Sequence, residues 1–92
     1  MLSERIRSLR IANSISQVEL AGRLGVTKQS VSNWENDNIQ PSIDMLIKLA
    51  KVFSVSTDYL LGLDDRKYIE VTGLSNSNIA HIKLIIDDIK NN

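Results

Sequence analysis

The stretch ISQVELAGRLGVTKQSVSNWE, residues 15–35, carries the signals for two short helices joined by a very tight turn. Ser16 can cap the first helix, predicted over residues 16–24, and a glutamate three positions later completes a capping box. Gly25 follows, and glycine readily adopts the positive φ at which helices end. One residue separates this glycine from Thr27, a good N-cap for a second helix that runs to the end of the stretch. Two consecutive helices with so short a connection predict a helix-turn-helix.

The second helix of this pair, over residues 27–35, has an apolar side and a polar side. Val31 and Trp34 can fasten it to a core, while the small side chain of Ala21 lets the two helix axes approach closely. At about 100° per residue, its remaining polar side chains gather within an arc of about 140° on roughly the opposite side. Such an arc alone is typical of a solvated helix face. Combined with the tight turn, it favours a surface whose amide, hydroxyl and ammonium groups match base edges in the major groove of DNA. The arc contains no acidic residue and consists of Lys28, Gln29, Ser32 and Asn33.

The rest of the chain predicts four further helices and no long strand. Apolar spacing and capping residues place these helices over residues 2–12, after Pro41-Ser42, from Ser56 to Gly62, and from Ser75 to about Lys90. Residues 68–72 alternate apolar and polar side chains, which is weak evidence for a short strand. We therefore expect an all-α fold, with a five-helix domain over residues 1–63 and a charged linker plus C-terminal helix over residues 64–92.

The composition excludes several kinds of functional site. The 92 residues include no cysteine and one histidine, so the chain offers no disulfide, no thiolate and no pair of imidazoles for zinc. It also lacks a nucleophile elbow, an EF-hand loop and a phosphate loop. No enzyme activity, cofactor, metal or small-molecule ligand is expected. The longest apolar runs are three residues, against the roughly 20 that a membrane span needs, so we expect a cytosolic protein without a membrane partner.

The formal net charge is zero, but the charges are unevenly distributed. Residues 1–35 hold five basic and three acidic side chains, whereas the remaining residues are mildly acidic. An excess this small limits nonspecific attraction to a polyanion. If the chain binds DNA, backbone amides and helix dipoles must carry much of the phosphate contact.

Four sequence strings, in this order, resemble the lambda-repressor-like helix-turn-helix family of phage repressors and many bacterial regulators. The resemblance covers residues 6–62, about two thirds of the chain. One departure is Asp37, because the family usually has glycine just after its third helix. The matching strings are Ile15-Ser16-Gln17-x-Glu19-Leu20-Ala21, Leu24-Gly25-Val26, Val31-Ser32-x-Trp34-Glu35 and Val55-Ser56-x-Asp58-Tyr59-Leu60-Leu61-Gly62.

The resemblance implies roles for several polar residues of this domain. The arc on the second helix of the pair would meet base edges of double-stranded DNA. Arg10 and Glu35 would form a partly buried ion pair that joins the first helix to the end of the third. The residues that it implies as phosphate contacts are Gln17, Asn36, Asn38 and Gln40, with Ser30 at the rim able to contact a base or a phosphate. Apart from the resemblance, we expect Arg5, Arg7 and Arg10 of the first helix to lie on a solvated helix face, with Arg10 as the exception that contacts a phosphate.

The C-terminal helix displays isoleucines at 3-4-3 spacing, with one more that widens the stripe. The five-helix domain is complete at Gly62, so this helix has little left to pack against. We expect the stripe to form a seam with a second copy, although packing on its own domain or on a different protein would produce the same pattern. The stripe consists of Ile79, Ile82, Ile85, Ile86 and Ile89.

Together, these features predict a homodimeric regulator, most simply a repressor, that binds a palindromic operator. A two-fold dimer can place two recognition helices one duplex turn, about 34 Å, apart. It also buries more surface on DNA than one half-site can, which strong specificity requires. The alternative is a protein-interaction module, such as an antitoxin or anti-repressor-like partner, that binds another protein through the isoleucine stripe.

Overall fold

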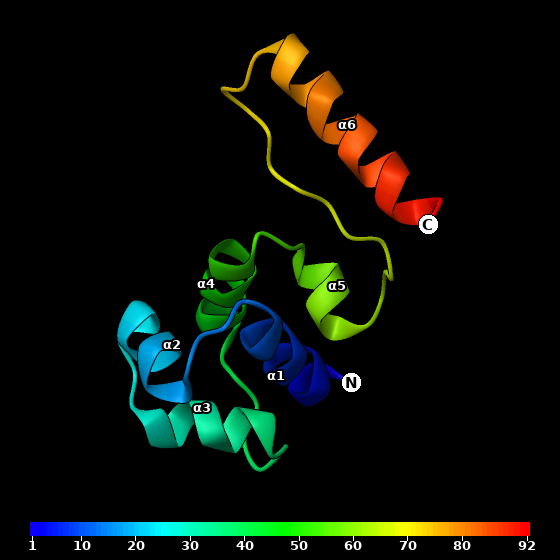
Figure 1. Cartoon of the computed structure of the whole chain (residues 1–92). Helices are drawn as coiled ribbons and strands as arrows, with labels where there is room; N and C mark the ends of the chain where they lie inside the picture. Colours follow the sequence, from blue (N-terminus) through cyan, green and yellow to red (C-terminus); the bar gives the residue numbers. More distant parts are fainter.

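The computed structural model describes residues 1–92 and contains six helices and no strand, which confirms the all-α prediction. The first five helices gather into one body, and the sixth lies apart from them beyond an extended segment (Figure 1). No helix combines the length and the apolar composition that a membrane-spanning segment requires. The helices are α1 (Leu2–Ala12), α2 (Gln17–Leu24), α3 (Lys28–Glu35), α4 (Ile43–Phe53), α5 (Thr57–Leu61) and α6 (Asn76–Lys90).

Short-range hydrogen bonds define where the helices begin. Each helix from α2 to α6 starts after a serine or threonine whose hydroxyl accepts a hydrogen bond from the backbone N–H three residues on, at 3.0–3.2 Å. This contact satisfies one of the N–H groups that the first helical turn leaves without a partner. In α2 the capping box is complete, because the Glu19 carboxylate also accepts from the N–H of its cap residue. The caps are Ser16, Thr27, Ser42, Ser56 and Ser75.

A residue with positive φ follows each helix of the pair α2–α3. Gly25 ends α2 with a φ of 72°, a conformation that is free of strain only for a residue without a Cβ. Asp37 has a φ of 58° just after α3, at the position where the resemblance leads one to expect glycine. Aspartate is among the few other residue types that adopt this conformation at modest cost. Asp37 therefore takes a left-handed conformation, as a glycine at this position readily would.

One core joins the five helices of the body. Each helix contributes a fully buried aliphatic side chain, and burying one such side chain contributes roughly 1.5–3 kcal/mol. Trp34 of α3 lies in the same cluster. α3 packs against both α1 and α2, so the core determines which side of α3 stays outside. The fully buried side chains are Ile6, Leu20, Val31, Leu49 and Leu60.

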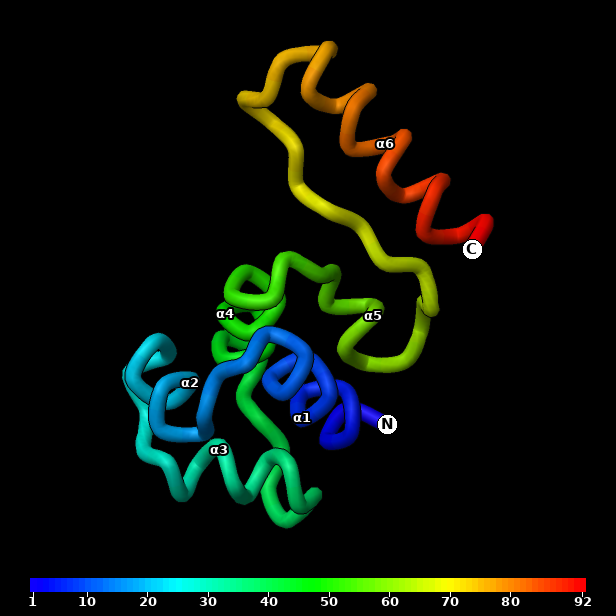
Figure 2. Tube along the Cα trace, viewed as in Figure 1, coloured from blue at the N-terminus to red at the C-terminus, as the bar shows by residue number.

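α6 adds no buried residue to this core. One edge of its isoleucine stripe lies over the extended chain of residues 67–71, with an apolar cavity of about 400 Å³ between them. The stripe residues on this edge are half-buried, whereas Ile85 and Ile89 on the other edge are 47% and 70% exposed. Residues 68–71 run extended without a strand beside them and Thr72 lies in a turn, so the short strand considered from the sequence is not formed (Figure 2).

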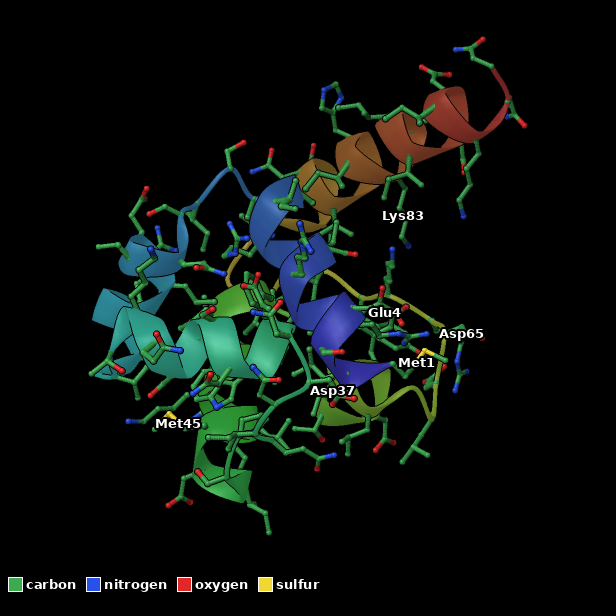
Figure 3. The ribbon with its side chains drawn as sticks, turned by 90° about the horizontal axis from the view of Figure 1, so that it is seen from below. Met1, Glu4, Asp37, Met45, Asp65 and Lys83 are labelled. Carbon is green, nitrogen blue, oxygen red and sulfur yellow. The ribbon has the colours of Figure 1, made fainter.

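Arg5 fixes the point at which the chain leaves the body. Its guanidinium lies 4.2 Å from the centre of the Tyr59 ring and donates to the backbone oxygen of that residue. It also donates to the Asp64 carbonyl oxygen at 3.2 Å and to the Asp65 carboxylate at 2.7 Å. Asp65 accordingly lies beside the first turn of α1, near Met1 (Figure 3). The start of the linker is therefore anchored to the N-terminal helix.

Candidate nucleic-acid interface

The body presents α3 on its outer edge (Figure 1). The turn before it is held by a hydrogen bond of 3.0 Å from the Val26 N–H to the Ala21 carbonyl oxygen. Val31 and Trp34 are buried against the body, so the polar arc predicted from the helical wheel lies on the outside of α3. Lys28 and Gln29 are exposed, while Ser32 and Asn33 are half-buried.

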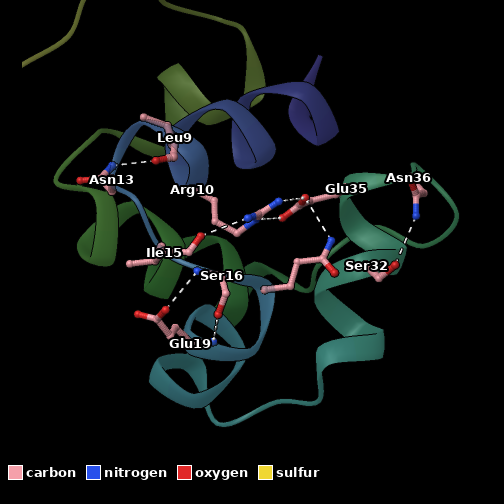
Figure 4. Close-up of polar contacts among 10 residues, drawn as sticks. Leu9, Arg10, Asn13, Ile15, Ser16, Glu19, Ser32, Glu35 and Asn36 are labelled. Atoms are coloured by element: carbon pink, nitrogen blue, oxygen red, sulfur yellow. Dashed lines mark hydrogen bonds and ion pairs between the residues drawn. The ribbon is translucent and has the colours of Figure 1, made fainter.

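Hydrogen bonds between side chains order most of this arc. The Gln29 side-chain N–H group donates to the Asn33 side-chain oxygen at 3.0 Å, one helical turn away. Asn36 donates in the same way to the Ser32 hydroxyl at 3.2 Å (Figure 4). Each pair holds two flexible side chains in one geometry before any ligand arrives, which lowers the entropy lost on binding. The Gln29 oxygen, the Asn33 amino group and the Lys28 ammonium remain free to pair with bases.

Ser30 is half-buried at the rim of the arc. Its hydroxyl lies 3.1 Å from the hydroxyl of Thr27, and its backbone N–H donates to the same hydroxyl. The side chain therefore belongs to the cap that starts α3. A hydroxyl both donates and accepts, so it retains hydrogen-bonding capacity toward a phosphate.

Arg10 and Glu35 form a bidentate ion pair beneath this surface (Figure 4). Nε and Nη2 of the arginine lie 2.7 and 3.0 Å from the two carboxylate oxygens, and Nη1 donates to the Ile15 carbonyl oxygen at 3.0 Å. The two side chains are 14% and 2% exposed. The hydrogen bond from the arginine to Glu35 raises the pKa of Arg10 above its ordinary value. Every guanidinium nitrogen of Arg10 is thus engaged inside the protein, which argues against the phosphate contact expected of this side chain.

Gln17 joins the same cluster, a contact that the sequence reasoning missed. Its side-chain N–H group donates to the Glu35 carboxylate at 3.3 Å, which ties the first turn of α2 to the end of α3. The backbone N–H groups of Gln17 and Val18 have no partner within the protein. They lie at the positive end of the α2 dipole, a place suited to a phosphate oxygen.

The loop after α3 supplies the remaining candidate side chains. Asn36, Asn38 and Gln40 are all exposed, and the Asn38 N–H donates to the Asn33 carbonyl oxygen at 2.9 Å. This bond closes the loop against the end of α3. Asp37 is exposed in the same loop, so one carboxylate stands among the predicted phosphate contacts. The base-facing arc itself has no acidic group.

The arrangement also shows a role for Arg5 that the sequence reasoning missed. The sequence predicts a solvated helix face for Arg5, yet this residue contacts Tyr59, Asp64 and Asp65 at the C-terminal end of the domain. The only indication of this role in the sequence was the position of Arg5 on a first helix that has one apolar side. A helical wheel does not show which distant segment a side chain meets.

Comparison with known proteins matches residues 6–60 to the helix-turn-helix family. The HTH-type transcriptional regulator ImmR of Bacillus subtilis (strain 168) is 37% identical over 78 residues, which are 85% of this chain and 61% of ImmR. The chain thus spans about three fifths of the length of this relative.

Two solved structures are similar to different extents of the chain. The P22 c2 repressor in complex with synthetic operator 9T is 36% identical, with a TM-score of 0.66, and covers 70% of this chain and 97% of its own. A chain of the SinR protein–SinI protein complex is 25% identical, with a TM-score of 0.64, and covers 100% of both chains. The second likeness therefore includes α6.

Proposed function

Because this chain belongs to the helix-turn-helix family, we propose that it is a DNA-binding transcriptional regulator that places α3 in the major groove. The family match confirms the resemblance predicted from the four sequence strings. One observation carries the proposal: α3 is held on the outside of the body with an acid-free arc, and most of this arc is already ordered by hydrogen bonds. An α-helix fits the major groove, and amides pair there with adenine edges.

In the proposed complex, base edges contact the arc of Lys28, Gln29, Ser32 and Asn33. Phosphates flank it on two sides. The free backbone N–H groups of Gln17 and Val18, at the start of α2, hold one phosphate. Side chains at the rim and in the loop after α3 hold the others, and these are Ser30, Asn36, Asn38 and Gln40.

Replacement of Gln29 by alanine tests this assignment. The cognate site is first selected from a random duplex pool at a stated salt concentration. On that site, we expect Gln29→Ala to weaken binding by about 1–3 kcal/mol and to relax the preference at one or two base positions. On random DNA the affinity should stay the same. His81→Ala, which removes an exposed side chain of α6, is the control. Equal losses on selected and random DNA would exclude base reading by Gln29.

We further propose that the regulator is a homodimer and, most simply, a repressor that occludes a promoter. Isoleucines left exposed on α6 would meet the same residues of a second copy, and the two α3 helices would then read a palindrome about one turn apart. The exposure of Ile85 and Ile89 supports this proposal, since nothing in the chain covers them.

Truncation after Leu63 tests the dimer. All buried core residues precede this point, so the body should stay folded. We expect a monomer in sedimentation and much weaker operator binding, because a single half-site buries less surface. A truncated protein that still sediments as a dimer would place the interface in the body instead.

A second candidate function uses α6 to bind a different protein. The likeness to a chain of the SinR–SinI complex, which extends over α6, favours it. The two candidates make different predictions for the purified full-length chain. A stable monomer with exposed isoleucines would support a foreign partner, and a dimer that α6 substitutions dissociate would support self-association.

A further inference from the structure

Residues 67–70, between the body and α6, form an extended chain whose backbone polar groups are unpaired. None of their N–H or C=O groups takes part in a hydrogen bond. In Figure 2 the segment runs with no strand beside it. A row of unpaired donors and acceptors on an extended chain is a template for pairing with another strand.

The side chains of this segment are those that favour strands. Tyr68, Ile69 and Val71 are aromatic or β-branched, the types enriched in sheets. Tyr68 and Ile69 are 55% and 69% exposed, which is unfavourable for large apolar groups in an isolated chain. The exposed side chains and the unpaired backbone groups both indicate a strand whose partner strand is absent.

α6 already provides the cover that a small ribbon needs. A two-stranded ribbon is marginal in water unless it packs against a helix. Here the apolar cavity between the segment and α6 is lined by Ile69 and Val71 on one side and by Ile79, Ile82 and Ile86 on the other. A second strand beside the first would extend this apolar surface toward the α6 of another copy.

We infer that residues 66–70 pair with the same residues of a second copy as a two-stranded antiparallel ribbon. The inference rests on the homodimer proposed above and adds a second element to its interface. The occupant is a second copy because the segment directly adjoins α6, which carries the proposed dimer seam. Each copy also supplies an identical unpaired strand, as a two-fold interface requires.

Charge selects the register of the ribbon. In an antiparallel pair of identical strands, two-fold symmetry places one residue of each strand opposite the same residue of the other strand. If that central residue were Glu70, two carboxylates would lie opposite each other, which is unfavourable. A centre at Tyr68 instead sets Arg66 opposite Glu70 of the partner subunit, twice, and stacks the two tyrosines. Arg66 is available, because its side chain is 76% exposed even while it contacts Asp64 at 3.2 Å, and ion pairs at a protein surface are weak.

Charge exchange in the full-length chain tests the ribbon. Glu70→Arg sets two arginines opposite each other in both pairs, and we expect the dimer dissociation constant to rise about tenfold. The double variant Arg66→Glu/Glu70→Arg restores opposite charges and should return the constant to that of the natural chain. Asp88→Arg makes the same charge change on the polar side of α6 and should have no effect. Both residues of the proposed pair are exposed, so thermal unfolding followed by Trp34 fluorescence should stay unchanged.

Two further measurements separate the ribbon from the dimer itself. In the dimer, amide hydrogen exchange at residues 66–70 should slow at least tenfold relative to dilute monomer. Because the chain has no cysteine, Tyr68→Cys would carry a single thiol and should form a disulfide-linked dimer under mild oxidation. If the protein dimerises but Glu70→Arg changes nothing and these amides exchange freely, the ribbon is wrong and the α6 dimer stands. If the natural chain is a monomer at every concentration, both proposals are overturned.

Discussion

Removing the Glu35 carboxylate should be among the most destabilising single changes in the body. Glu35→Ala leaves the Arg10 guanidinium with its hydrogen bond to the Ile15 carbonyl oxygen but without a counter-ion. It also removes the acceptor of the Gln17 side chain. Breaking a buried ion pair from one side costs about 3–5 kcal/mol, and the partial exposure of Arg10 places the expected loss near 3 kcal/mol.

This loss is large compared with the total stability of the body. At roughly 0.05–0.15 kcal/mol per residue, residues 1–63 unfold with a free energy of about 3–9 kcal/mol. Urea unfolding followed by Trp34 fluorescence measures the change, because Trp34 is the only tryptophan and is buried in the core. The hydrogen bond to Glu35 raises the pKa of Arg10 above its ordinary value. A group with a raised pKa contributes its full stabilisation at every pH below its ordinary pKa and loses it only as the pH rises through the raised value. The difference between the natural chain and Glu35→Ala should therefore stay constant from pH 7 to pH 10.

Two other variants serve as controls. Arg66→Ala breaks an exposed ion pair with Asp64 and should cost less than about 1 kcal/mol. The double variant Arg10→Met/Glu35→Leu replaces both buried charges by apolar groups and should recover most of the loss. The reasoning is refuted if Glu35→Ala costs no more than Arg66→Ala, or if the double variant is as unstable as the two single changes added together.

Three smaller perturbations test the local structure and the electrostatics of DNA binding. Gly25→Ala should lower the free energy of unfolding by about 1 kcal/mol because the φ of this residue is 72°, whereas Gly22→Ala should raise it by about 0.5–1 kcal/mol, because Gly22 lies inside α2 with nothing within 4 Å of the new methyl group. Equal effects of the two changes in urea unfolding would contradict this reasoning. Ser16→Ala should lower the free energy of unfolding by about 1 kcal/mol because α2 loses its cap. An unchanged midpoint of urea unfolding would argue against the capping box. A plot of log affinity for DNA against log salt should have a slope no steeper than about −4, since few basic side chains face the DNA; a slope near −10 would exclude a binding mode based on backbone amides.

The helices and their boundaries could be predicted from the sequence because short-range contacts determine them. The cap hydroxyl of Ser16 and the N–H that it binds lie three residues apart, and Gly25 ends its helix through its own backbone preference. The exposed arc of α3 followed from the positions of Val31 and Trp34, because a helix buries its apolar side whatever it packs against.

The tertiary structure decided which distant groups meet. Arg10 and Glu35 are 25 residues apart, and only the family resemblance suggested that they pair. Nothing in the sequence indicated that Gln17 would join them or that Arg5 would anchor residues 64 and 65, since these contacts depend on how the helices pack. The segment at 68–72 had the pattern of a strand, but a strand exists only with a neighbour to accept its hydrogen bonds, and one chain supplies none. Local hydrogen bonds can be predicted from residues that are close in the sequence, whereas long-range contacts depend on how the whole body packs.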